Sequence, residues 1–137
     1  MKIRVFLIIC FYSAFQIISA QKAPTIKNDV VYYLSSIFEG GKKNNLCRDK
    51  GHIVFNTNKK TAACFTSCSF MQLQFSQKGT AFGFTITGQP KDPCPDMLLG
   101  IEEDLKNNLP KVNSYQIKGK DLIFFSNKDT LFVFHEK

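Results

Sequence analysis

Four cysteines carry most of the chemistry that this chain offers. The 137-residue sequence has five cysteines, and Cys47, Cys64, Cys68 and Cys94 follow an apolar leader that holds the fifth. Four thiolates can bind zinc tetrahedrally, or they can pair as two disulfides in an oxidising compartment. The leader favours export, so we predict two disulfides and no metal site.

The first twenty residues have the layout of a signal peptide. Lys2 and Arg4 precede an uncharged, mostly apolar run of about 14 residues, and Ser19-Ala20 supplies small residues at the expected cut. A bilayer-spanning helix needs roughly 20 apolar residues, which is more than this run provides. We predict a signal peptide at 1–20, one mature domain at 21–137, and a secreted or periplasmic location.

The net charge of the chain and the absence of known catalytic motifs argue against several classes of function. Of 18 basic residues, removal of Lys2 and Arg4 leaves 16 against 11 acidic ones, a formal charge of +5. The lysines fall at expected turns rather than in a stripe, which argues against nucleic-acid binding and remains compatible with peripheral contact at an anionic membrane. No serine-nucleophile motif or phosphate-binding glycine loop occurs. We therefore expect a monomeric protein that is not an enzyme and uses no cofactor.

The remaining titratable residues also suggest structural roles. His52 and His135 are the only histidines, and their spacing does not bring them together with a carboxylate or a thiolate. Glu102-Glu103-Asp104 forms an acidic cluster on an expected helix. A hydrolase with paired carboxylates would need a second carboxylate from another element, and the sequence indicates none.

Periodicity predicts four strands, one helix and three strands. The helix begins near Pro95 and ends before Pro110, with Met97, Ile101 and Leu105 on one apolar face. The expected strands are 30–38, 51–55, 62–75, 81–87, 112–117, 122–126 and 131–134. The order β-β-β-β-α-β-β-β indicates an α+β domain with a mostly antiparallel, strongly curved or barrel-like sheet and one helix that packs on the sheet or closes it.

The hairpin between the second and third strands suggests a disulfide pairing. If Thr57 and Asn58 are the central residues of its turn, opposed positions have numbers that sum to 115. Cys47 then faces Cys68 at a separation that a disulfide can bridge with modest adjustment. Cys64 and Cys94 pair by elimination. A slip of one residue in the hairpin register would undo this argument.

Phenylalanine is the most unusual feature of the composition. The chain has 14 phenylalanines and no tryptophan, and many of the phenylalanines lie on expected strands. Core packing explains this content. The functional alternative is an apolar cavity in the curved sheet that takes a lipid or another hydrophobic ligand. The candidate ligand-binding residues are Phe70, Phe82, Phe84, Phe124 and Phe132.

The sequence from Cys94 onward resembles the META/HslJ family. Cys94-Pro95, a helix with Glu102, the segment 112–122 and Leu131-Phe132-Val133-Phe134 match the family's Cys-Pro segment, helix, hairpin and final strand. Upstream, Ala63-Cys64-Phe65 stands where the family has Gly-Cys-Asn, and Tyr33-Leu34 where it has Trp-x-Leu. The resemblance covers roughly residues 30–135. It implies that Cys64 and Cys94 lie close together, in agreement with the pairing above.

The resemblance also implies a cellular setting. Members of the family are exported or envelope-attached proteins linked to stress and drug-tolerance phenotypes, with no established enzymatic activity. Their fold is similar to that of a lipid-binding pilotin of secretion systems, which is an analogy of fold only. We expect a non-enzymatic envelope protein associated with stress that binds a hydrophobic ligand in its sheet. The alternative is a module that binds an envelope protein, as inhibitor or assembly factor, through the loops 39–45 and 89–93.

Overall fold

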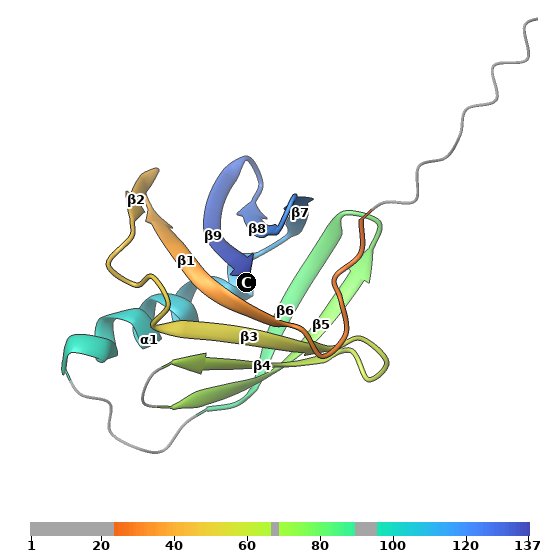
Figure 1. Cartoon of the computed structure of the whole chain (residues 1–137), viewed down its shortest axis with the longest axis horizontal. Helices are drawn as coiled ribbons and strands as arrows, with labels where there is room; N and C mark the ends of the chain where they lie inside the picture. The colour runs from red at the N-terminus through yellow and green to blue at the C-terminus, as the bar shows by residue number, and fades with distance from the viewer. Residues whose placement is uncertain (1–23, 67–68, 90–95) are drawn as a thin grey trace, which may run out of the picture.

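The computed structural model describes residues 24–66, 69–89 and 96–137, and these ranges form nine strands and one α-helix (Figure 1). The leader at 1–20 lies outside them, so its cleavage remains a prediction. The elements in chain order are β1 (Val31–Glu39), β2 (Lys42–Asn44), β3 (Gly51–Asn56), β4 (Thr61–Thr66), β5 (Phe70–Lys78), β6 (Ala81–Gly88), α1 (Asp96–Asn108), a 3₁₀ turn (Leu109–Lys111), β7 (Ser114–Lys118), β8 (Asp121–Ser126) and β9 (Asp129–Glu136).

The strands form one antiparallel sheet whose two ends meet. Their order is β2-β1-β3-β4-β5-β6-β7-β8-β9, and β1 also pairs with β9. The weakest junction in this order is β6–β7, where Ala81 and Ser114 form a single bridge. Helix α1 lies toward the end of the sheet that carries β2 and the start of β3 (Figure 1). The α+β class and the mostly antiparallel, curved sheet are therefore as predicted.

Strict alternation along the strands separates an inner face from an outer face. In β3, Gly51, Ile53 and Phe55 are buried, whereas His52 and Val54 are only partly so. In β5, Met71, Leu73 and Phe75 are buried, and the residues between them are mostly exposed, as the sequence predicted. Leu105 of α1 and Leu109 of the 3₁₀ turn are fully buried and complete the core.

Aromatic rings fill the interior. Phe55, from β3, lies within 6.5 Å, centroid to centroid, of rings from β5, β6 and β8. Phe82 and Phe84 lie 4.8 Å apart, and Phe124 is 5.3 and 5.1 Å from them. Edge-to-face and stacked rings at such distances add to the free energy of burial. Non-local ring contacts of this kind hold strands from both halves of the chain together.

Two parts of the sheet differ from the sequence prediction. Residues 62–75 were expected as one strand, but β4 ends at Thr66 and β5 begins at Phe70, because the chain reverses between them. Thr66 and Ser69 flank this reversal and are joined through backbone and hydroxyl hydrogen bonds. The segment 39–45 was expected as a loop, but Gly40 and Gly41, both with positive φ, turn the chain into the short strand β2.

The predicted hairpin register was wrong. Ile53 pairs with Cys64 and Asn56 with Thr61, so opposed positions sum to 117 and not to 115. The turn has four residues rather than two, with Lys60 at φ 55° and the Asn56 side chain accepting the Lys59 N–H at 3.0 Å. Because β3 begins at Gly51, Cys47 lies outside the hairpin. The register argument for a Cys47–Cys68 disulfide therefore does not hold.

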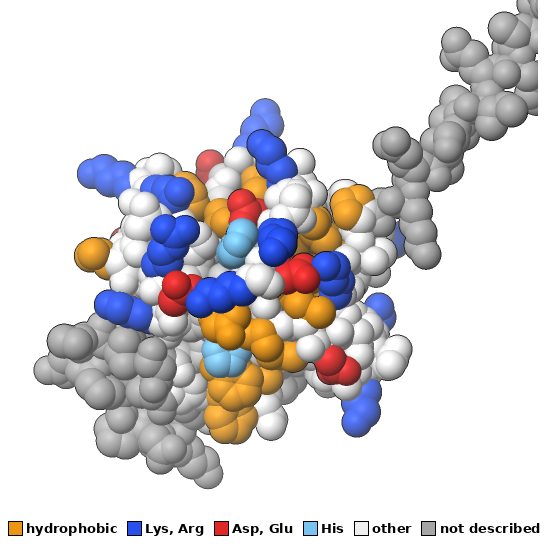
Figure 2. Space-filling view, viewed as in Figure 1, with side chains coloured by type: hydrophobic (Ala, Val, Ile, Leu, Met, Phe, Trp, Pro, Cys, Tyr) orange, Lys and Arg blue, Asp and Glu red, His pale blue; other side chains and the backbone are white. Residues whose placement is uncertain are grey.

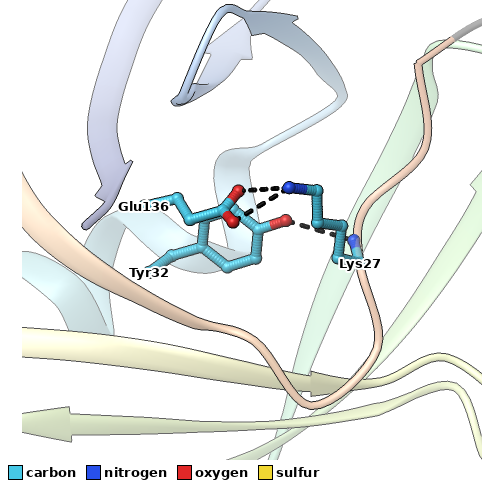
Figure 3. A network of polar contacts seen from close by, with 3 residues as sticks. All are labelled: Lys27, Tyr32 and Glu136. Carbon is cyan, nitrogen blue, oxygen red and sulfur yellow. Dashed lines mark hydrogen bonds and ion pairs between the residues drawn. The ribbon is translucent and has the colours of Figure 1, made fainter.

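A polar network fastens the start of the described chain to the end of β9 (Figure 3). The Lys27 ammonium donates to both carboxylate oxygens of Glu136 at 2.9 and 2.7 Å, and the Lys27 backbone N–H donates to the Tyr32 hydroxyl at 3.1 Å. The hydrogen bond to Glu136 raises the pKa of Lys27, and burial raises the pKa of Tyr32. These contacts therefore fix β9 at Glu136, next to His135, whose side chain lies on the outer face of the sheet.

We predict that Phe124→Ala destabilises the domain by about 3–5 kcal/mol, because it removes a fully buried ring that contacts Phe82, Phe84 and Phe134. Urea unfolding followed by circular dichroism measures the change. Phe70→Ala is the matched control, since the Phe70 side chain is 49% exposed and should cost less than about 1 kcal/mol. Similar losses for the two variants would contradict this assignment of the core.

Candidate functional site

Two of the four cysteines that were predicted to form disulfides lie within the described residues. Cys47 and Cys64 are both buried, and neither forms a disulfide with another residue that the structure describes. Burial raises the pKa of Cys47 and raises that of Cys64 to about 12, so neither thiol is activated as a nucleophile. Cys68 and Cys94 lie outside the described residues. The pairings Cys47–Cys68 and Cys64–Cys94 therefore stay predictions, and the structure contains no disulfide among the residues it describes.

The five phenylalanines proposed to bind a ligand fall into two groups. Phe82, Phe84, Phe124 and Phe132 are at most 5% exposed and belong to the ring-filled core. Phe70 is on the opposite face of the sheet, where it is half exposed. The structure therefore does not bring the five together around one cavity, and it favours core packing for four of them.

An aromatic row crosses the outer face of the sheet instead. Tyr33 on β1 is opposite His52 on β3, His52 is opposite Phe65 on β4, and Phe65 is opposite Phe70 on β5. Their ring centroids are 5.8, 4.6 and 5.7 Å apart in turn. We call these four residues the aromatic row. Figure 2 shows hydrophobic side chains gathered beside a histidine on this face.

The geometry of the row makes it a ridge. The rings of His52 and Phe65 are nearly parallel, with an interplanar angle of 16°, so they stack on each other. Burial lowers the pKa of His52, which keeps its ring neutral at pH 7. A hollow of about 410 Å³, lined in part by Val54, Ala63 and Gln72, runs over β3, β4 and β5, which are three of the four strands that carry the row. The small side chain of Ala63 leaves part of this space open beside the ridge.

At the β1 end of the row, a bulge changes the backbone. Strand β1 pairs Leu34 with Phe134 but Ser36 with Val133, so Ser35 is an extra residue in β1. The Leu34 carbonyl accepts the Asp49 backbone N–H at 2.8 Å. The buried Ser36 hydroxyl donates to the Asn45 side-chain oxygen at 2.9 Å. Both bonds hold the segment 45–50 against the bulge.

The bulge and the segment 45–50 together create a polar pocket. It has a volume of about 430 Å³, and its side-chain lining includes Tyr33, Ser35, Arg48, Asp49, His135 and Lys137. We call it the bulge pocket. Tyr33 belongs both to this pocket and to the aromatic row, so the two features are continuous. Two cations, one histidine and one carboxylate line it, which gives the pocket a positive balance.

Some of these charges already have partners. The Lys137 ammonium lies 4.1 Å from the centre of the Tyr33 ring and 3.3 Å from Asp49 Oδ1. His135 Nδ1 and Asp121 Oδ1 are 2.7 Å apart, and both side chains are 46% exposed. The His–Asp pair orients the imidazole and leaves Nε2 available. The spacing in the sequence indicated no carboxylate partner for His135, because the pairing depends on the β8–β9 register.

A second carboxylate pairing was also missed. Asp104 on α1 shares a hydrogen bond with Glu39 at the end of β1, although no carboxylate from another element was expected there. Burial, followed by the hydrogen bond and charge of Glu39, raises the pKa of Asp104 to about 6. On the same helix, Glu102 accepts a hydrogen bond from the Ser69 hydroxyl at 2.9 Å. Two acidic residues of the cluster therefore join α1 to the sheet.

Comparison with known proteins identifies the family. A model of the META domain matches residues 25–137, nearly the whole described chain. The chain belongs to the META domain family. The resemblance predicted from Cys94-Pro95, the hairpin and the last strand is thus confirmed. A search of the curated proteins found no match to this META domain.

Two solved structures have a similar fold. A crystal structure of a DUF4847 family protein from Bacteroides vulgatus gives a TM-score of 0.64 at 10% identity, covering 82% of this chain and 95% of that one. An NMR structure of a protein from Burkholderia xenovorans also gives a TM-score of 0.64, at 14% identity, covering 80% and 83%. At such identities the likeness concerns the fold alone. Within the described residues of this META domain, no helix has the length and apolarity needed to cross a membrane.

We predict that Asp104→Asn abolishes part of the pH dependence of stability. The folded-state pKa of Asp104, about 6, lies above its ordinary value of 3.8, so its protonation favours folding. This contribution is fully present below about pH 3.8 and is lost as the pH rises through 6. The wild type should therefore gain on the order of 1 kcal/mol from this group between pH 7 and pH 5, after allowance for solvent screening.

Urea midpoints at pH 7 and pH 5 measure this effect. Asp129→Asn, which removes an exposed carboxylate from the start of β9, is the matched control and should keep the wild-type difference between the two pH values. If Asp104→Asn keeps that difference as well, the Asp104–Glu39 pair does not link α1 to the sheet as described.

Proposed function

We propose that this META domain is an exported, non-enzymatic binding module that holds an apolar segment of a partner protein on its outer face. The observation that carries the proposal is the aromatic row, which leaves Phe70 half exposed next to the stacked rings of Phe65 and His52. Contiguous exposed apolar patches on soluble domains are typical of binding sites. Aromatic residues are also enriched where proteins bind one another.

The interior is a weaker candidate for ligand binding. A lipid chain inside the sheet would need space among Phe82, Phe84 and Phe124, whose ring centroids are only 4.8–5.3 Å apart. Those separations are the ordinary ones for rings in contact, and a ligand could enter only by displacing core side chains. The outer face offers apolar contact without such a cost, which favours a protein partner over a lipid held in the sheet.

The proposal includes where the domain acts, which is at the cell envelope after export and under stress. Residues 1–20 have the composition of a signal peptide, and family membership makes a role at the cell envelope reasonable. An exported module that recognises apolar segments suits conditions in which envelope proteins expose such segments. The domain would then act by binding and not by catalysis.

Selection from a displayed library of random 12-residue peptides tests the binding surface. We expect the purified mature domain to enrich peptides with aromatic and aliphatic residues. A Phe65→Ala/Phe70→Ala variant should bind the selected peptides at least about tenfold more weakly, because it removes the exposed half of the row. Peptide affinities measured by fluorescence anisotropy give the comparison.

Phe125→Ala is the matched control for this experiment. Phe125 is a partly exposed phenylalanine on β8, outside the aromatic row, and its replacement should leave peptide affinity unchanged. Enrichment of no peptide, or equal binding to the wild type and the double variant, would contradict the proposed function.

A further inference from the structure

We infer that the bulge pocket binds a carboxylate side chain, so that the partner segment carries an acidic residue a few positions from its apolar residues. This inference rests on the proposed function, because it names the partner that the aromatic row would hold. Its basis is the position of the pocket, which shares Tyr33 with the row and therefore lies at one end of the same binding surface.

Arg48 is the residue best placed to receive the carboxylate. It lines the bulge pocket, and its side chain forms no hydrogen bond or ion pair with any residue that the structure describes. The other pocket cation, Lys137, is already paired with Asp49. A planar guanidinium matches a carboxylate with two parallel N–H donors, which a lysine cannot do.

The backbone around the pocket is also fixed by hydrogen bonding. The hydrogen bond from the Asp49 N–H to the Leu34 carbonyl fixes the backbone next to Arg48, at a residue with φ 59°. The bulge residue Ser35 and His135, whose ring is oriented by Asp121, also line the pocket. An entering carboxylate would therefore meet the Arg48 guanidinium, with the Lys137 ammonium close by, in a space of about 430 Å³.

The spacing of the strands sets the length of the motif. From Tyr33 on β1 to Phe70 on β5 the row crosses three strand-to-strand steps, or roughly 14 Å at about 4.8 Å per step. An extended peptide covers that distance in about four residues at roughly 3.3 Å each. The partner segment should thus have an acidic residue that is separated by four or five positions from its aromatic residues.

Synthetic peptides test the inference with defined probes. The first probe is acetyl-Gly-Glu-Ser-Gly-Ser-Phe-Phe-Gly-amide, whose capped ends remove the terminal charges. The second replaces its Glu by Gln, and the third replaces both Phe by Ser. Titration into the isotopically labelled domain, followed by NMR chemical shifts, gives each affinity and the residues that respond.

We expect the Glu peptide to bind the wild type about tenfold more tightly than the Gln peptide. This ratio corresponds to the free energy gained from one charge-assisted pair of hydrogen bonds. Arg48→Gln should abolish this ratio, because it removes the guanidinium that distinguishes the Glu peptide from the Gln peptide. Lys118→Gln makes the same charge change on an exposed residue of β7 and should keep the ratio. Addition of 0.5 M NaCl should reduce it.

The outcomes separate the inference from the proposed function. Equal binding of the Glu and Gln peptides, with loss of both in Phe65→Ala, overturns the carboxylate site and leaves the aromatic row standing. No shift with any peptide overturns both. Unchanged discrimination in Arg48→Gln overturns the assignment of Arg48. If phosphatidylserine vesicles show Arg48-dependent binding and the Glu peptide does not, the occupant is a membrane surface and the inference fails.

Discussion

The pairing of β1 with β9, with one extra residue at Ser35, is the constraint on which the rest of the structure depends. This pairing joins the first described strand to the last and so brings together the two ends of the sheet. It places aromatic residues from both halves of the chain around one interior. At this bulge the Leu34 carbonyl accepts a hydrogen bond from the Asp49 N–H. That bond positions the segment 45–50, which lines the bulge pocket.

The two faces of the sheet then have different roles. Inside, Phe55, Phe82 and Phe124 contact one another and stabilise the fold. Outside, the antiparallel register aligns Tyr33, His52, Phe65 and Phe70 in one row, although they come from four strands. Cross-strand neighbours of this kind interact directly, so the row is part of the sheet's stability as well as a surface. A binding role for the row therefore adds to its structural one.

Much of this architecture could be predicted from local patterns. Alternation in the sequence separates Met71 and Leu73 from Phe70 and Gln72, and the apolar spacing in α1 anticipates the burial of Leu105. The family could be recognised from a few residues after Cys94. These features are local, and the physical preferences of short segments determine them.

The candidate site could not be predicted in the same way, because it depends on register. A four-residue turn in place of a two-residue turn shifts the β3–β4 partners, so the sequence paired His52 with Ala63 and concealed its stacking on Phe65. The bulge at Ser35 and the His135–Asp121 contact likewise arise from pairings between distant strands. The cysteine pairing failed as an argument for the same reason. The periodicity of side chains along one strand does not determine which residues of a distant strand they pair with.

Amide hydrogen exchange at Asp49, measured by NMR, tests the central claim most directly. The account holds that the Asp49 N–H is bound to the Leu34 carbonyl beside the bulge, even though the Asp49 side chain is exposed. It therefore predicts protection of at least about 100-fold over a free loop amide, comparable to amides in β1. Exchange of Asp49 at the rate of an unstructured chain would contradict the account, because segment 45–50 would then not be fixed against β1.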